Sequence, residues 1–281
     1  MFRKIAKKIL TKSPKTYTAI HEANFQRKHK QDFSNLNENE KSILSQINQN
    51  GYVVINDFMD KKICDNCIQD MDWMFENKKE FVHSSDYADH RIFGAEDLSK
   101  NISKFSSHTL LEKLANAYNA TPTSNGFTLA GKIETTGHEF GSGGSWHRDS
   151  YFRQFKSLLY LTDVNEENGP FEVILGSHDR KNISADSKSA DLESMQCTFN
   201  QKTVEKILND DPERLKTLTA KAGTVVLVDT STIHRGSPLK NGIRYALTNY
   251  YFENSQINSH LVEHFSPLVS PEKVLKMGRV N

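Results

Sequence analysis

The sequence predicts a mainly β fold of the antiparallel sandwich or barrel type, with helices around it. From about residue 128 onward, short apolar runs alternate with turn residues, a spacing typical of antiparallel strands. Two Asn-Gly pairs, Asn168-Gly169 and Asn241-Gly242, lie beside such runs and are strong turn signals. The runs cover residues 128–134, 157–164, 171–175, 224–230 and 244–252.

Helices are expected to surround this β region. Residues 34–50 read as a polar-faced helix that ends at Gly51, and residues 52–55 as a strand that enters the core. A further helix is expected over residues 61–77. Residues 81–104 show no clear period and are expected to form a loop over the pocket.

The length of 281 residues allows one or two domains, and we expect a single one. A polar stretch rich in Lys, Ser and Asp interrupts the β pattern, with helices expected near 203–208 and 212–218. Such an insertion can carry substrate contacts, and a solvated excursion is the plain alternative. The expected parts are a helical arm (1–50), a support of helices and a strand (51–127), the β core (128–252) with its insert (177–222), and a C-terminal tail (253–281).

The composition is that of an ordinary globular protein, with 25% charged and 36% hydrophobic residues and a formal net charge of +1. Because the charge is balanced and no basic stripe is interleaved with aromatic residues, nucleic acid is not an expected partner. Three cysteines and the lack of a secretory or long apolar segment favour a cytoplasmic location. Cys64 and Cys67 form a lone CxxC, for which a structural role is favoured over a metal or redox site.

The first ten residues form a short basic amphipathic pattern, with apolar side chains on one helical face and Arg and Lys on the other. Weak peripheral contact of residues 1–12 with an anionic membrane would suit a lipid-linked substrate. Because one short helix binds lipid weakly, a helix packed on the protein or a frayed terminus is the favoured interpretation.

The chemistry centres on the tetrapeptide WHRD at residues 146–149, which is followed much later by His234 and Arg244. Alternate side chains of a strand share a face, so His147 and Asp149 can bind one ion, and His234 must come from a neighbouring strand. Such a set occupies one side of an octahedral Fe(II) ion and leaves positions open for a cosubstrate and O2. A buried Arg244 would be costly unless a carboxylate meets it, either from a bound cosubstrate or from an internal salt bridge.

Other residues of the predicted strands are candidates for the pocket. Tyr160, Lys132 and Thr248 could donate hydrogen bonds to the cosubstrate, but period-two patterning does not tell which of them face inward until the strand register is known. Trp146 and Tyr151 flank the metal strand and could wall the pocket or fill the core.

These motifs together resemble the phytanoyl-CoA dioxygenase (PhyH-like) family of Fe(II)/2-oxoglutarate-dependent oxygenases. The resemblance spans roughly residues 128–252 and implies a double-stranded β-helix, also called a jelly roll or cupin-like core, wrapped by N-terminal helices. The similar segments are WHRD (146–149), SLLYLTDV (157–164), EENGP (166–170), LGSH (175–178), HRG (234–236) and RY (244–245).

The resemblance implies iron ligation by His147, Asp149 and His234 and a cosubstrate contact by Arg244. Family members that lack the aspartate can halogenate, so Asp149 implies hydroxylation of an unactivated C–H bond with release of succinate and CO2. Some members have a hydroxyl-bearing cosubstrate contact where this chain has Gly236. The implied partners are O2 and a small-molecule or lipid-linked substrate.

Two other classes of function fit parts of this pattern. A cupin-like zinc or manganese hydrolase or isomerase could use the same three ligands, although it needs no arginine to anchor 2-oxoglutarate. A non-catalytic binding module on the same scaffold is the third interpretation, and the complete ligand set with its arginine disfavours it.

Overall fold

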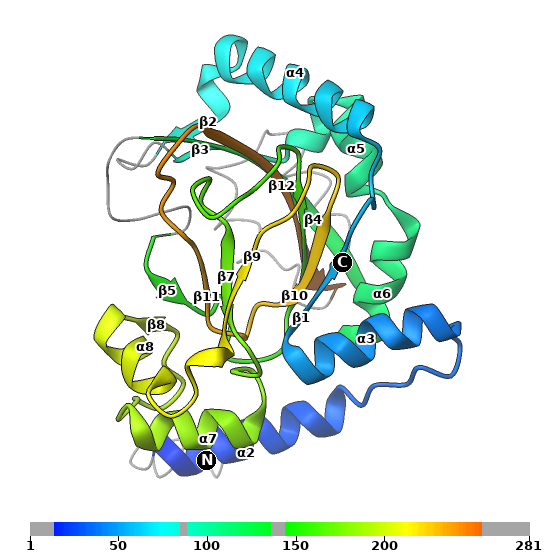
Figure 1. Cartoon of the computed structure of the whole chain (residues 1–281). Coiled ribbons are helices and arrows are strands. Elements are labelled where there is room, and N and C mark those ends of the chain that lie inside the picture. The colour runs from blue at the N-terminus through cyan, green and yellow to red at the C-terminus, as the bar shows by residue number, and fades with distance from the viewer. Residues whose placement is uncertain (1–13, 85–88, 136–143, 255–281) are drawn as a thin grey trace.

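The computed structural model describes residues 14–84, 89–135 and 144–254, which form two antiparallel sheets with helices packed outside them (Figure 1). Between β4 and β12 the chain passes repeatedly from one sheet to the other, which is the jelly-roll arrangement. The predicted mainly β fold is thereby confirmed. The larger sheet consists, from edge to edge, of β1 (Tyr52–Ile55), β10 (Val225–Asp229), β6 (Phe155–Tyr160), β12 (Ile243–Glu253), β4 (Thr123–Glu134), β3 (Asp89–Phe93) and β2 (Val82–Ser84). The smaller sheet consists of β8 (Thr198–Phe199), β5 (Trp146–His147), β11 (His234–Gly236), β7 (Phe171–Ile174) and β9 (Leu215–Leu218).

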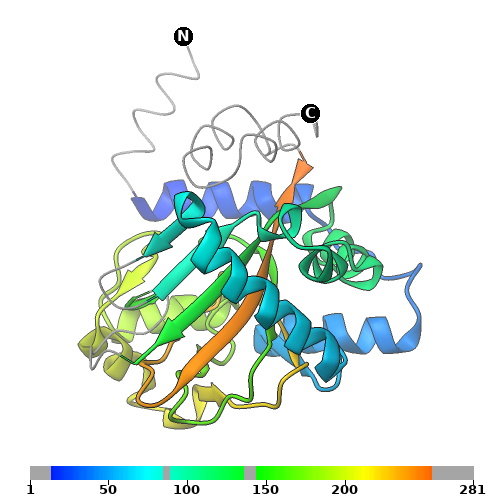
Figure 2. The same cartoon turned by 90° about the horizontal axis from the view of Figure 1, so that it is seen from above.

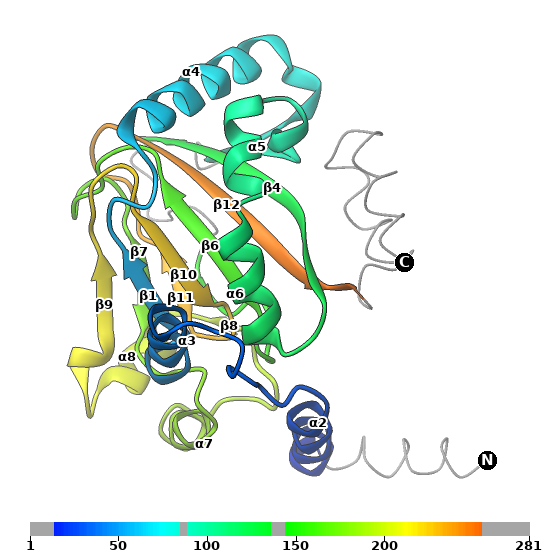
Figure 3. The same ribbon diagram turned by 90° about the vertical axis from the view of Figure 1, so that its right-hand side faces the viewer.

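The helices lie on the outer sides of the two sheets. Figure 3 shows α5 and α6 on one side of the larger sheet and the strands of the smaller sheet on the other. The described helices are α2 (Pro14–Lys28), α3 (Glu38–Asn50), α4 (Lys61–Asn77), α5 (Lys100–Ser106), α6 (Thr109–Asn119), α7 (Arg180–Ser189) and α8 (Gln201–Leu208).

Strand β10 is apolar at four consecutive positions because both faces of the larger sheet are covered. Val225 and Leu227 pack in the core beneath the helices, whereas Val226 and Val228 lie in the core between the two sheets. The continuous apolar run of this strand therefore reflects its central position, with the helices on one side and the site-bearing sheet on the other.

Helix α3 is bounded by local signals, and its end supports the site. Asn37 and Glu40 form a capping box at its start, and Gly51 ends it with a left-handed φ of 89°. A Cβ atom on Gly51 would lie 2.3 Å from Oγ1 of Thr232, and the Gly51 carbonyl accepts a bond from the amide of Asp229 at 2.8 Å. The end of α3 thus packs tightly on the segment that leads into β11.

Helix α4 lies over the larger sheet (Figure 2) and buries one apolar face in the main core. Cys64, Cys67, Met71 and Met74 recur at helical spacing on this face, and all are fully buried. Burial raises the pKa of Cys64 to about 11 and that of Cys67 to about 12. Both thiols are free and neutral, which fits the structural role favoured for the CxxC motif.

The expectation of a loop over residues 81–104 is wrong. Strands β2 and β3 extend the larger sheet here, with Ile92 of β3 opposite Ala130 of β4, and α5 follows. Strand β2 is a short edge strand, and β3 beside it begins with Asp89, His90 and Arg91, so neither strand shows a clear apolar alternation in the sequence.

The insert at 177–222 is part of the smaller sheet. Helix α8 confirms the helix predicted near 203–208, but the one predicted near 212–218 is wrong, because a 3-10 turn (Pro212–Arg214) leads into strand β9 there. Strands β8 and β9 pair with β5 and β7 and form both edges of this sheet. Arg214 binds Asp186 of α7 with two bonds of 2.7 and 3.0 Å, which ties the helix to the sheet.

Helix α2 lies beside α7 at the bottom of Figure 1, where Glu22 forms an ion pair of 3.1 Å with Arg180. The basic segment at residues 1–12, for which membrane contact was considered, lies outside the described residues. Within the described part of the chain, no helix combines the length and the apolar character needed to cross a bilayer.

Candidate active site

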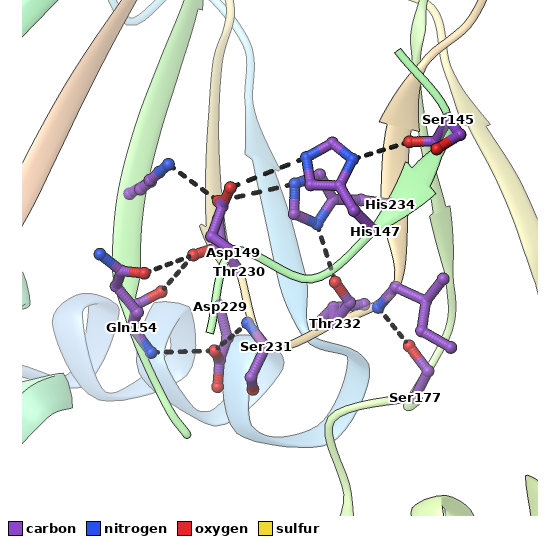
Figure 4. A network of polar contacts seen from close by, with 12 residues as sticks. Ser145, His147, Asp149, Gln154, Ser177, Asp229, Thr230, Ser231, Thr232 and His234 are labelled. Atoms are coloured by element: carbon purple, nitrogen blue, oxygen red, sulfur yellow. Dashed lines mark hydrogen bonds and ion pairs between the residues drawn. The ribbon is translucent and has the colours of Figure 1, made fainter. Parts of the chain in front are cut away.

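Strands β5 and β11 bring the two histidines of the predicted metal site side by side. His234 is the register partner of His147, and Asp149 follows β5 directly. Nε2 of His147 lies 3.7 Å from Oδ1 of Asp149, and Nε2 of His234 lies 3.6 Å from Oδ2 (Figure 4). One potential ligand atom from each residue lies within 4.8 Å of the other two. The three residues singled out from the sequence thus form one cluster that could hold a metal ion.

Both imidazoles are oriented by backbone carbonyls. Nδ1 of His147 bonds to the carbonyl of Ser145 at 2.8 Å, and Nδ1 of His234 bonds to the carbonyl of Thr232 at 2.8 Å (Figure 4). Because a carbonyl can only accept, the proton of each ring lies on Nδ1. The Nε2 lone pairs are therefore free to bind an ion beside Asp149.

The protonation states at this cluster suit a divalent cation. Burial lowers the pKa of His234 to about 4, so its ring is neutral at pH 7. Burial alone would raise the pKa of Asp149, but the ammonium of Lys156 and the two imidazoles outweigh this and hold it below its ordinary value. Neutral imidazole and ionised carboxylate are the forms that bind metal ions.

The segment around Asp229 holds the ligand strands in place. Its carboxylate accepts bonds from the Gln154 amide at 3.1 Å and from the Tyr118 hydroxyl at 2.8 Å. The next residue, Thr230, accepts the amide of Asp149 at 3.0 Å through its carbonyl. Figure 4 shows that this network continues from the metal cluster to the end of β10. No motif predicted this network, because Tyr118, Gln154 and Asp229 are far apart along the chain.

Arg244 is buried on β12 and has no carboxylate partner within salt-bridge distance among the described residues. Arg244 is only 6% exposed, and its Nε has no hydrogen-bond partner among the described residues. Burial lowers the pKa of this guanidinium. A buried cation in this state is costly, so the site is complementary to an anion. The alternative of an internal salt bridge is not observed within residues 14–84, 89–135 and 144–254.

A cavity of about 230 Å³ joins Arg244 to the metal cluster, since His147, Asp149, His234 and Arg244 all line it. Alternation along β12 places Thr248 on the same face as Arg244, and Thr248 also lines the cavity. Of the three additional cosubstrate contacts considered, this threonine is the one that the structure brings to the cavity.

Lys132 and Tyr160 are not among the described residues that line the cavity. The register of β4 turns Lys132 to the opposite face, where it forms an ion pair of 2.8 Å with Glu134. The hydroxyl of Tyr160 donates to the Leu218 carbonyl at 2.9 Å and accepts a backbone N–H of β7 at 3.0 Å. The structure does not bring either residue to the described lining of the cavity, and a cosubstrate contact by them stays a prediction. Lys132 points away because of the register of β4, which the sequence did not supply. Tyr160 shares a face of β6 with Leu158, but its hydroxyl is bonded to Leu218 and to β7.

Trp146 and Tyr151 fill space outside the cavity. Trp146 belongs to the core between the smaller sheet and α8, and the Arg180 guanidinium lies 4.9 Å from the centre of the Tyr151 ring. Of the two interpretations considered for these aromatics, the structure favours core filling for Trp146.

Two cationic side chains that line the cavity, Lys156 and Arg91, were not predicted as site residues from the sequence. Lys156 of β6 places its Nζ 2.8 Å from Oδ2 of Asp149, and Arg91 of β3 is paired with Asp89. The predicted apolar run began at residue 157, just after Lys156. Alternation with Leu158, which faces the cavity too, is the signal that could have identified this lysine.

Two histidines and one carboxylate clustered on a jelly roll are typical of mononuclear non-haem metal proteins. The fold and the cluster of His147, Asp149 and His234 place this protein in that class. The family model "Phytanoyl-CoA dioxygenase (PhyH)" matches residues 47–244, and the chain belongs to this family. The family and the His-Asp-His cluster together support a non-haem iron, 2-oxoglutarate-dependent enzyme.

Solved structures of similar fold include enzymes that depend on α-ketoglutarate. EctD from S. alaskensis in its apoform has a TM-score of 0.62 and 15% identity, covering 81% of this chain and 82% of that one. The epimerase SnoN, in complex with Fe3+, α-ketoglutarate and nogalamycin RO, has a TM-score of 0.56 and 14% identity, covering 77% and 84%. The carbocyclase SnoK has a TM-score of 0.56 and 17% identity, covering 78% and 85%. Identities this low show a shared fold alone. Among curated proteins, no sequence matches this chain.

Proposed function

We propose that the protein is an Fe(II)/2-oxoglutarate-dependent dioxygenase that hydroxylates an unactivated C–H bond of a small-molecule or lipid-linked substrate and releases succinate and CO2. His147, Asp149 and His234 would hold the iron, and Arg244 would bind the far carboxylate of 2-oxoglutarate. The observation that carries this proposal is that Arg244, which has no carboxylate partner among the described residues, lines the same cavity as the three ligands. A zinc or manganese hydrolase with the same ligands has no use for such an arginine.

The described residues fit these groups. When bound, iron and 2-oxoglutarate supply the oxidising chemistry, and the protein contributes binding and orientation. Leu158, Phe171 and Val228 give the cavity an apolar wall that limits water beside the reacting carbon. With about 230 Å³, the cavity is smaller than the roughly 300–1,000 Å³ of typical ligand pockets, which favours a small substrate or the reactive end of a larger one.

Anaerobic titration with Fe(II) and 2-oxoglutarate tests the assignment. We expect the visible metal-to-ligand absorption band of a chelated 2-oxoglutarate. Arg244→Leu should weaken 2-oxoglutarate binding by about 30-fold or more, because loss of one partner of a buried charge pair costs about 2–5 kcal/mol. Lys132→Met, which removes a lysine outside the cavity, is the matched control and should leave the titration unchanged. If the band shows that Arg244→Leu binds 2-oxoglutarate as tightly as the wild type does, the role proposed for this arginine is wrong.

The ligand assignment makes a second prediction. His147→Ala and Asp149→Ala should each abolish substrate-dependent succinate formation, because the ion loses one of three protein ligands. Labelled O2 with each candidate substrate separates hydroxylation, which incorporates one oxygen atom into the product, from epimerisation or ring closure, which incorporates none. Succinate formation at the wild-type rate in either variant contradicts the assignment.

A further inference from the structure

Lys156 is a buried cation beside the candidate metal ligands that has no part in the function proposed above. It is 5% exposed and lines the cavity. Its Nζ lies 2.8 Å from Oδ2 of Asp149 and 3.5 Å from the centre of the Tyr250 ring. Both contacts are of the kind that an ammonium group makes, an ion pair with a carboxylate and a cation–π contact with an aromatic ring.

The ion pair with Asp149 balances the charge of Lys156 only while that carboxylate is not shared. A ferrous ion bound at the same carboxylate withdraws much of its charge, since a dication competes with the ammonium for the same oxygens. The lysine is then a buried cation without an adequate counter-charge, which is unfavourable in a site of low dielectric.

The charges of the loaded cavity do not cancel. Iron and 2-oxoglutarate offset each other, Arg91 is paired with Asp89, and Asp149 is the one carboxylate among the described lining residues. Asp149 compensates for one of the two remaining cations, Lys156 and Arg244. One positive charge is therefore left in the described part of the cavity, and a further anion would balance it.

We propose that Lys156 binds an acidic oxyanion group of the substrate, such as a carboxylate, sulfonate or phosphonate, beside the metal position. This inference rests on the proposed function, because it assumes that iron and 2-oxoglutarate occupy the cavity. A lysine suits this task because its ammonium is a compact point charge on a flexible stem, able to turn from Asp149 to a ligand. Leu158 and Val228, which line the same cavity, would contact the apolar part of the substrate.

The test uses full-length protein loaded with Zn(II), which has no redox chemistry, and 2-oxoglutarate. Acetate, methanesulfonate and methylphosphonate are the probes, acetamide is the neutral control, and binding is followed through the NMR signal of each methyl group. We expect at least one oxyanion to bind and acetamide to bind far more weakly. The three probes distinguish a carboxylate, a sulfonate and a phosphonate as the preferred group.

Variants connect the binding to the lysine. Lys156→Met should weaken oxyanion binding by about 30-fold or more, the fold-change that corresponds to losing one partner of a buried charge pair. Lys156→Arg should retain most of the binding, and Lys156→Gln, which keeps a hydrogen-bond donor near Asp149, should lose it. Lys132→Met controls for the loss of a lysine outside the cavity. If Lys156→Met fails to fold, the contrast between Lys156→Arg and Lys156→Gln decides the question.

The outcomes separate the two proposals. Equal oxyanion binding in wild type and Lys156→Gln, or no oxyanion binding to the loaded wild type, overturns this inference while the visible band with Fe(II) and 2-oxoglutarate still supports the proposed function. Failure of the wild type to bind metal and 2-oxoglutarate overturns the proposed function itself. Loss of oxyanion binding in Lys156→Met with the visible band retained supports both.

Discussion

Two arginines, the partly buried Arg214 and the buried Arg244, illustrate how a counter-charge decides what a residue does for the protein. Arg214 binds the carboxylate of Asp186 through two nitrogens, and Asp186 is 2% exposed. Arg244 is itself 6% exposed and has no carboxylate within salt-bridge distance among the described residues. Arg214 stabilises the fold, whereas Arg244 is available for a ligand and destabilises the folded state of the ligand-free protein.

Leucine substitutions at these two positions should therefore have different effects on the ligand-free protein. Arg244→Leu should leave the free energy of unfolding unchanged or raise it, because it removes an uncompensated buried charge. Arg214→Leu should lower it by about 3–5 kcal/mol, because it strands the buried carboxylate of Asp186. Urea denaturation followed by circular dichroism measures both. An equally large loss of stability in Arg244→Leu would mean that its guanidinium has a counter-charge inside the protein.

At the scale of an element, helix α4 shows that a CxxC motif, which resembles a metal or redox site, can instead be part of the hydrophobic core. Cys64 and Cys67 are separated by one helical turn and continue into Met71 and Met74 on the same buried face. Their neutral thiols contribute to core packing. Two cysteines on one helix supply only two of the four ligands that a structural zinc site needs.

Thiol alkylation tests this role of α4. Cys64 and Cys67 should stay unmodified in the native protein at pH 7. Both side chains are fully buried, and their pKa values of about 11 and 12 keep the reactive thiolate form scarce. The half-buried Cys197 should react first, and the other two should react only as the protein unfolds in urea. Mass spectrometry of the alkylated peptides identifies the sites, and fast native labelling of Cys64 would contradict the assigned burial.

For the whole molecule, ligand binding should add to stability, because the site draws on both sheets. His147 and His234 lie on the smaller sheet, and Arg244 lies on the larger one. An ion with 2-oxoglutarate would therefore connect the two sheets across the cavity, and a ligand that binds only the folded state stabilises it by mass action.

Zn(II) and 2-oxoglutarate together should raise the melting temperature by about 5 °C or more at 100 times the dissociation constant, where the gain is about 2.7 kcal/mol. The shift caused by 2-oxoglutarate should be larger with metal than without it, since the ion supplies part of its binding site. His147→Ala should remove most of the combined shift. Differential scanning calorimetry measures these shifts, and a full shift in His147→Ala would show that the ligands bind elsewhere.

The sequence by itself determined the mainly β architecture and the three clustered residues His147, Asp149 and His234, and it singled out Arg244, which lines the same cavity. These depend on local periodicity, turn residues and short motifs, which are written along the chain. Only the tertiary structure decided that Thr248 and Lys156 line the cavity while Lys132 and Tyr160 are not among its described lining residues, and that residues 81–104 extend a sheet. A slip of one residue in strand register reverses every side chain of a strand, and register is set by contacts between segments far apart in sequence.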